Sequence, residues 1–265
     1  MNLKLVFLPI VVLLFSILSC SEYNKVLKSE DLTLKYDKAI QYYEEDEYAK
    51  AYPLLEESIT IYRGTSKAEK LYYYFAYSDY YLGDFFLASH RFKNFKKMYP
   101  TSKHAEECHF MSAYCHYLNS PNYSLDQNDT KQAISELQSF VNQYPESQLL
   151  DSCNTLVDEL RGKLEKKSFE IAKQYYHTRD YKSAIKAFEN CLVDFPDTDY
   201  KEEVLYLAVK ANYDLAANSI DSKKAERYDA TIKSYVKFVD SFPNSKRIKE
   251  LETVYESAVK GKSKV

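Results

Sequence analysis

The sequence predicts an all-α fold, an α-solenoid of about five helix hairpins with a C-terminal capping helix. Its main support is one spacing that recurs along the chain: a small residue, apolar residues four and seven positions later, and a proline five positions after that. Residues at i, i+4 and i+7 share one helix face, and proline cannot continue a helix, so each copy predicts the second helix of a hairpin and its end. The copies are Ala88/Phe92/Phe95/Pro100, Ala133/Leu137/Phe140/Pro145, Ala184/Phe188/Cys191/Pro196, Thr231/Tyr235/Phe238/Pro243 and the degenerate Ala51/Leu55/Ser58/Arg63.

The small residue in this spacing has a physical purpose. A helix that packs closely on its hairpin partner needs a small side chain at the closest crossing, and the larger side chain one turn later fills the groove beside it. The segment Leu82-Gly83-Asp84 predicts the break between two helices, with Asp84 as the N-cap of the second.

These features resemble the second half of a tetratricopeptide (TPR) repeat. The segment Gly83-Asp84-Phe85, followed by Ala88, Phe92 and Pro100, carries the resemblance, and Tyr175–Ala184 carries it equally well. The tryptophan of the family's first helix is missing, because the chain contains none.

The repeats and flanking segments follow from this register. We expect a signal peptide at 1–19, a lipidated tether at 20–32, the solenoid at 33–260 and a disordered tail at 261–265. A helical period that persists from residue 147 to residue 177 predicts one extended helix shared by the third and fourth repeats. The predicted repeats are 34–63, 66–100, 102–145, 165–196 and 199–243, followed by a cap at 245–260.

Composition excludes several classes of function. The net charge of −3 argues against nucleic acid as the main partner, which would require a strong basic excess. Four glycines in 265 residues exclude a glycine-rich phosphate loop. No nucleophile, base and orienting group stand out together, so we expect a protein that is not an enzyme and needs no cofactor.

The N-terminus predicts a lipid anchor. Lys4 is followed by an apolar run, Leu5–Leu18, which is too short to span a bilayer comfortably. The run ends in Ile17-Leu18-Ser19-Cys20, which resembles the lipobox of bacterial lipoproteins and implies cleavage before Cys20 and acylation (palmitate) of that residue. An ordinary secretory signal and a retained membrane helix are the alternatives. Ser and Glu after Cys20 do not resemble an inner-membrane retention signal, so we expect the periplasmic face of the outer membrane, with surface export left open.

Cysteine and histidine residues raise the question of a disulfide or a metal site. Cys108, Cys115, Cys153 and Cys191 fall on repeat positions where the other copies carry apolar or small residues, so we expect them to be core residues. A bridge between Cys108 and Cys153 stays open at this point. His104, Cys108 and His109, near Cys115 and His116, resemble a ligand cluster, and His104 and Cys108 share a helix face. We expect no metal site there, because the set as a whole points to different faces and Cys108 belongs to the core.

Tyrosine is the compositional outlier, with 27 residues. A single helix face cannot hold all the tyrosines of 72–81, so some must leave the core, where their rings and hydroxyls suit peptide recognition. Simple core filling is the alternative. The candidate residues for a peptide groove are Tyr72, Tyr73, Tyr77, Tyr80 and Tyr81.

Together, the lipobox, the five repeats, the long helix and the hairpin ends of the form Tyr/Phe-Pro-x-Ser/Thr resemble the BamD family of outer-membrane assembly lipoproteins. An Asp126-Gln127 pair within the loop Asn119–Asp129 is a further point of resemblance and a candidate interaction loop. The resemblance implies a non-catalytic subunit of the β-barrel assembly (BAM) complex. Its N-terminal repeats would bind unfolded outer-membrane protein substrates, and its C-terminal repeats would bind the periplasmic domains of a BamA-like protein, beside other BAM lipoproteins.

Two other functional classes remain as alternatives. A TPR scaffold lipoprotein that organises the cell envelope or the peptidoglycan machinery would share the fold and the anchor but not the BamA-like partner. An enzyme using the His/Cys cluster would require bound metal.

Overall fold

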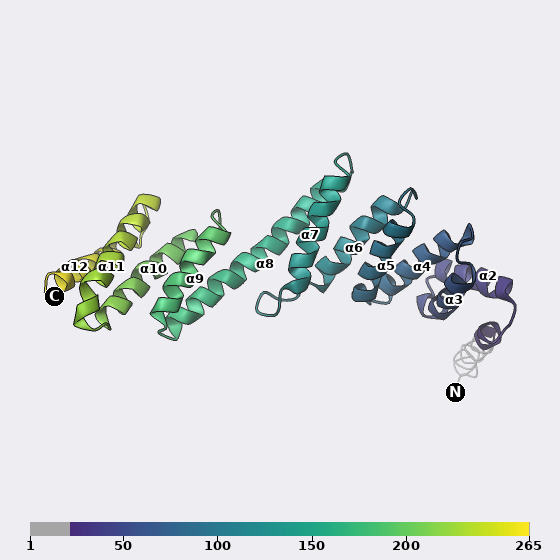
Figure 1. Ribbon diagram of the computed structural model, residues 1–265, viewed down its shortest axis with the longest axis horizontal. Coiled ribbons are helices and arrows are strands. Elements are labelled where there is room, and N and C mark those ends of the chain that lie inside the picture. Colours follow the sequence, from purple (N-terminus) through teal and green to yellow (C-terminus); the bar gives the residue numbers. More distant parts are fainter. Residues whose placement is uncertain (1–21, 265) are drawn as a thin grey trace, which may run out of the picture. The chain divides into compact units, whose positions relative to one another are not determined.

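The computed structural model describes residues 22–264, and within that range the protein is all-α, as predicted (Figure 1). The predicted signal peptide and Cys20 lie outside the described residues. The chain divides into two compact units. The first contains the chain up to Pro121 together with Asn128–Leu160, and the second contains Asn122–Gln127 together with the chain from Arg161 onward.

The first unit is a stack of antiparallel helix hairpins in which consecutive helices from α2 to α7 pack against one another, and α2 also reaches α4. Cys153 and Leu160 of α8 join the core cluster of α7. This alternation of contacts is typical of a solenoid, where each repeat buries its apolar face against its neighbours. Its helices are α2 (Leu32–Glu44), α3 (Tyr48–Ile61), α4 (Lys67–Tyr81), α5 (Phe85–Met98), α6 (Ala105–Asn119), α7 (Asn128–Gln143) and the first part of α8 (Leu150–His177).

The second unit has the same construction. The remainder of α8 is followed by α9 (Tyr181–Asp194), α10 (Lys201–Ala217), α11 (Asp221–Ser241) and α12 (Ile248–Lys262). Consecutive helices from α9 to α12 pack against one another, and α12 also contacts α10. The 28 residues of α8 confirm the predicted long helix.

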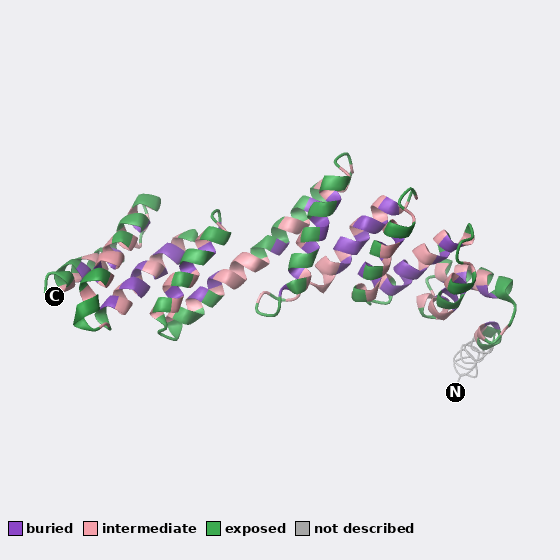
Figure 2. Ribbon diagram, in the orientation of Figure 1, coloured by how far each residue is buried: buried purple, intermediate pink, exposed green. Residues whose placement is uncertain are grey.

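The recurring spacing identifies the core correctly. The five small residues are fully buried on the second helices of the hairpins, and the apolar positions that follow them are buried in every complete copy except at Tyr235, which is partly exposed. Figure 2 shows buried residues as stripes along the helices, with exposed residues at the turns. The small residues are Ala51, Ala88, Ala133, Ala184 and Thr231.

Of the four described cysteines, Cys108, Cys115 and Cys153 lie on first helices, and Cys191 takes a position of the recurring spacing on α9. Cys108 and Cys153 are fully buried, as are their repeat equivalents Leu71, Val204 and Leu251. All four described cysteines are free, so Cys108 and Cys153 do not form the disulfide that the sequence left open. Burial raises the pKa of the Cys115 thiol to about 12 and that of Cys153 to about 11, which keeps both thiols neutral and unreactive.

Three of the hairpin turns, those before α3, α5 and α9, share one backbone feature. Asp46, Gly83 and Arg179 each precede the start of a second helix with a positive φ, of 60°, 83° and 65°. Gly83 adopts this conformation without steric cost, whereas the other two carry a Cβ. Asp84 then caps α5 as predicted, because its Oδ1 accepts the backbone N–H of Leu87 at 3.0 Å.

The serines of the hairpin ends connect successive repeats. Ser102 donates its hydroxyl to Glu69 Oε1 at 2.6 Å, and its Oγ accepts the backbone N–H of His104 at 3.0 Å. The same pair of bonds recurs in both units. Ser147 donates to Glu106 at 2.5 Å and Ser245 donates to Glu202 at 2.6 Å, each accepting a backbone N–H two residues later. We call this arrangement the Ser–Glu clasp.

Two boundaries differ from the sequence prediction. Residues 22–27 are helical, inside the segment predicted to be a tether, and Val26 is buried. At the other end α12 runs to Lys262, into the predicted disordered tail. Val26 packs into the core of the first repeat, and Lys262 Nζ donates to Asp229 Oδ1 at 2.6 Å. Single contacts of this kind leave no period in the sequence from which a helix could be recognised.

Replacing a core aromatic residue should test the register directly. Phe188 is 1% exposed and fills the second unit's core, so Phe188→Ala should lower the free energy of unfolding by about 3–5 kcal/mol. Urea unfolding followed by circular dichroism measures this change. The control is Val193→Ala on the same helix, where the side chain is 78% exposed and the expected change is within about 0.5 kcal/mol. Equal effects of the two variants would contradict the register.

Candidate functional site

The tyrosines of α4 do not form one continuous groove. Tyr77 is buried at 8% exposure, Tyr72, Tyr73 and Tyr80 are half-buried, and Tyr81 is 50% exposed. The sequence argument that some of these rings must leave the core is therefore correct. The structure assigns the five candidates to different environments.

A shared carboxylate holds two of these tyrosines in place. Tyr73 and Tyr77 donate their hydroxyls to the two carboxylate oxygens of Glu107, at 2.9 and 2.5 Å, and His104 Nδ1 lies 3.3 Å from the same group. Burial raises the pKa of the Glu107 carboxyl. The hydrogen bonds from Tyr77, Tyr73 and His104 lower it by more, so the net pKa lies below the ordinary 4.5. Burial is the largest cause of the raised pKa of the Tyr73 and Tyr77 hydroxyls, and the hydrogen bond to Glu107 is the next. Both hydroxyls therefore stay protonated and act as donors at neutral pH.

Tyr74 is fixed from the preceding repeat. Its ring stacks on Tyr43 with centroids 3.8 Å apart, and its hydroxyl donates to Glu44 Oε1 at 3.1 Å. Lys70 Nζ donates to the same carboxylate at 3.2 Å and lies 5.0 Å from the centre of the Tyr74 ring. The ring is therefore pre-organised, which lowers the entropic cost of binding against it.

Between α4 and the start of α6 lies a cleft of about 430 Å³, which we call the tyrosine cleft. Tyr73 and Tyr74 form its aromatic wall, and the His104 ring lies 4.2 Å from that of Tyr73. Lys103 is exposed at this cleft and makes no ion pair with any residue of 22–264. The cleft therefore offers stacking surface together with an available cation. Its lining residues are Ser66, Glu69, Lys70, Tyr73, Tyr74, Lys103 and His104.

Only Tyr73 of the predicted groove residues lines this cleft. Tyr72 and Tyr77 pack toward Phe95 and Phe92, and Tyr81 stacks on Tyr48. Sequence reasoning missed Tyr74, Lys70 and Lys103 as members of one site. The signal that could have found them is helix position, because Lys70, Tyr73 and Tyr74 lie three and four residues apart on one face of α4.

Asp126 and Gln127 have different environments, one on the surface of the loop and the other inside it. Gln127 is buried, and its Nε2 donates to the backbone oxygens of Asn122 and Leu125 at 2.9 and 3.0 Å. Lys167 Nζ donates to the Leu125 oxygen at 2.5 Å and thereby fixes the loop to α8. Gln127 shapes the loop from inside, whereas Asp126 is exposed on its surface. The interaction role of this loop stays a prediction.

A second concave surface lies in the second unit and had no sequence prediction. This α9–α11 groove, of about 520 Å³, has an apolar base and cationic borders. Leu192 and Leu205 contribute to the base and the exposed Val193 lies at the edge, while Lys233 and Lys237 of α11 are exposed and form no ion pair with a described residue. An apolar surface edged by available lysines suits an acidic, amphipathic segment.

The other chemical features of residues 22–264 are structural. Within that range no group of three or more His, Cys, Asp or Glu side chains could hold a metal ion. His109, considered as a ligand from sequence, is buried against Phe140 and Tyr144, and burial lowers its pKa to about 4, so its ring is neutral. None of the helices described here has the length and apolar character needed to span a bilayer.

The Glu107 network should leave a signature in the pH dependence of stability. Because the folded-state pKa of Glu107 is lowered, its contribution to stability is present above the ordinary pKa of 4.5 and is lost as the pH falls through the folded value. The advantage of the wild type over Glu107→Gln in urea midpoint should therefore shrink between about pH 5 and about pH 3. Glu146→Gln, on an exposed turn, is the control and should show no such trend. A constant difference between wild type and Glu107→Gln across this range would contradict the network.

Comparison with known proteins identifies the family. The family YfiO, described as outer membrane lipoprotein, matches residues 29–228 and 169–258, which together cover most of the chain. The outer membrane protein assembly factor BamD of Caulobacter vibrioides is 23% identical over 124 residues, which is 47% of this chain. The match spans 41% of the length of that relative. With its all-α repeat fold and this family match, the chain belongs to the YfiO family of outer membrane lipoproteins.

Proposed function

We propose that this lipoprotein is a lipid-anchored, non-catalytic subunit of the BAM complex on the periplasmic face of the outer membrane. It would be acylated at Cys20 and would bind both unfolded outer-membrane proteins and the periplasmic domains of a BamA-like protein, beside other BAM lipoproteins. The family match and the name of the Caulobacter vibrioides relative support this role. The single structural observation that carries it is the tyrosine cleft.

The chemistry of the tyrosine cleft suits the end of a peptide chain. A terminal aromatic side chain can stack against Tyr73 and Tyr74, whose rings are held by Glu107, Tyr43 and Glu44. A terminal carboxylate can pair with Lys103, which forms no ion pair among the described residues. The cleft would therefore take a C-terminal segment that ends in an aromatic residue.

The α9–α11 groove supports the second binding activity. From Ile185 to Val193 its α9 border extends for roughly 12 Å at 1.5 Å per residue, enough for about two turns of a partner helix. The lysines of α11 would select a partner segment with acidic residues beside its apolar stripe. We assign this groove to the periplasmic domains of the BamA-like protein.

Peptide binding should separate the two parts of the tyrosine cleft. A fluorescent peptide of alternating apolar and polar residues, ending in phenylalanine with a free carboxylate, should bind the wild type and lose affinity when amidated. Tyr74→Ala should weaken binding about 3- to 10-fold through lost stacking. Lys103→Glu should weaken it about 10-fold or more through lost charge pairing. Fluorescence anisotropy measures both.

The matched control for this experiment is Tyr81→Ala. Tyr81 lies on the same helix and is half-exposed, but it is not part of the cleft lining. Equal binding of the acid and amide forms, with no effect of Lys103→Glu, would contradict the cleft assignment.

Co-purification should test the partner. In mild detergent, the tagged lipoprotein should recover a β-barrel protein with periplasmic domains. Val193→Glu should lose this partner, because it places a carboxylate among the residues that line the groove, where an acidic partner segment would be repelled. The control is Val259→Glu on α12, where the side chain is 42% exposed, and this variant should retain the partner. Recovery of cell-wall proteins instead would favour the envelope scaffold over the BAM subunit.

A further inference from the structure

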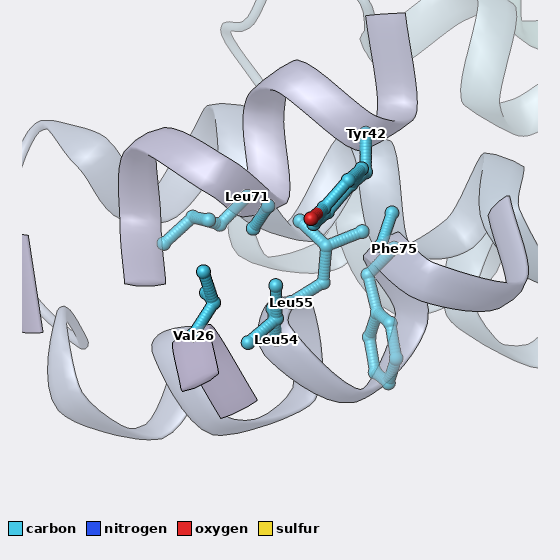
Figure 3. Packing of buried hydrophobic residues seen from close by; sticks show 8 residues of the cluster. Val26, Tyr42, Leu54, Leu55, Leu71 and Phe75 are labelled. Atoms are coloured by element: carbon cyan, nitrogen blue, oxygen red, sulfur yellow. The ribbon is translucent and has the colours of Figure 1, made fainter. Parts of the chain in front are cut away.

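The segment that follows the predicted lipidation site is docked on the first repeat. Residues 22–27 are helical, and Val26, at 4% exposure, belongs to the same core cluster as Leu54, Leu55 and Leu71. Figure 3 shows Val26 facing these leucines, which come from α3 and α4. The partly buried side chains of Tyr23 and Leu27 pack against the same cluster.

Polar contacts hold both ends of this segment. Glu22 Oε1 lies 3.3 Å from Lys38 Nζ on α2, and the Tyr23 ring meets the edge of Tyr42 with centroids 5.8 Å apart. At the other end Ser29 Oγ accepts the backbone N–H of Asp31 at 3.1 Å, and Asp31 in turn caps α2. The chain is therefore fixed from Glu22 to the first residue of α2.

This docking changes the reach of a lipid anchor at Cys20. If residues 21–32 were a flexible tether, their ends would lie about 20 Å apart on average and at most roughly 40 Å apart. With the segment docked from Glu22, only Ser21 separates Cys20 from a fixed residue. The span from Cys20 to Glu22 is then at most roughly 7 Å.

We propose that residues 22–28 act as a short rigid mount, which holds α2 of the first repeat against the phospholipid headgroups of the membrane. The proposal rests on acylation of Cys20, which belongs to the proposed function. A reach of roughly 7 Å is comparable to the headgroup layer of one leaflet, so α2 cannot move away from the surface while the mount stays docked.

The side chains around the mount suit this location. Lys25 and Lys28 of the mount are exposed, whereas the rings of Tyr23 and Tyr42 are partly or fully buried against the first repeat. Exposed lysines close to a lipid anchor are attracted to anionic headgroups. A lipid headgroup layer is the occupant that this charge and the short reach from Cys20 favour.

Proteolysis on vesicles tests the docked mount. The protein purified from membranes in detergent is reconstituted into vesicles of phosphatidylethanolamine and phosphatidylglycerol, recovered by flotation and treated with trypsin. Release of fragments that begin at Val26 or Ser29 reports cleavage after Lys25 or Lys28. The wild type and Glu30→Gln, an exposed position in the same segment, should release these fragments slowly. Val26→Asp should release them at least 10-fold faster, because the charge expels the segment from the core.

The outcomes separate the two hypotheses. Flotation with equally rapid cleavage of wild type and Val26→Asp would overturn the mount and leave lipidation intact. Failure of the wild type to float would overturn acylation at Cys20, and with it this proposal.

A distance measurement tests the position of α2. A fluorophore on Gln41→Cys, an exposed position of α2, should be quenched by headgroup-labelled lipid, because the mount holds α2 at the membrane surface. The described native cysteines are buried and stay unlabelled. A ten-residue Gly-Ser insertion between Ser21 and Glu22 should reduce this quenching several-fold. Equal quenching with and without the insertion would overturn the proposal.

Discussion

The close crossing of two helices within each hairpin is the constraint on which the structure depends. Ala51, Ala88, Ala133 and Ala184 are fully buried at the same position of successive hairpins, and Thr231 takes this place in the last one. A larger side chain there would separate the helices and displace the aromatic residue that fills the adjacent groove. The distance between the two helices at this crossing also sets how neighbouring hairpins stack, and therefore where the clefts between them lie.

The Ser–Glu clasp adds a polar link between repeats. A glutamate in the first turn of one hairpin accepts the hydroxyl of a serine that precedes the next hairpin. The serine lies 33, 41 or 43 residues after its glutamate, so the link tolerates loops of different length within a repeat. This tolerance explains how the long loop around Asp126 can be accommodated without loss of the stacking between neighbouring hairpins.

The fold could be predicted from sequence because its signal is periodic. The spacing of Ala88, Phe92, Phe95 and Pro100 recurs, and repetition separates a core position from chance. It also identified Cys108 and Cys153 as core residues through their equivalents Leu71 and Val204. The mount at 22–28 could not be found this way, because Val26 is a single apolar residue with no repeat partner.

The candidate sites were predictable only in part, for a related reason. Tyr73, a candidate from the sequence, lines the tyrosine cleft, but the cleft also requires Lys103 and His104 from the start of α6, and their proximity to α4 depends on how two hairpins stack. The α9–α11 groove is likewise made by three helices. The sequence around Leu192, Leu205 or Lys237 contains no local pattern that predicts a groove. Sites that arise between repeats are set by tertiary packing, which a linear pattern does not contain.

The carboxylate shared by Tyr73 and Tyr77 has an evolutionary consequence. Loss of Glu107 would leave two partly buried hydroxyls without their acceptor, loss of Tyr77 would leave Glu107 Oε1 without its donor, and loss of Tyr73 would leave His104 as the partner of Oε2. Each single step is penalised, whereas a joint change to Phe, Phe and an apolar residue is tolerated. The three positions should therefore vary together among relatives, as one inherited unit.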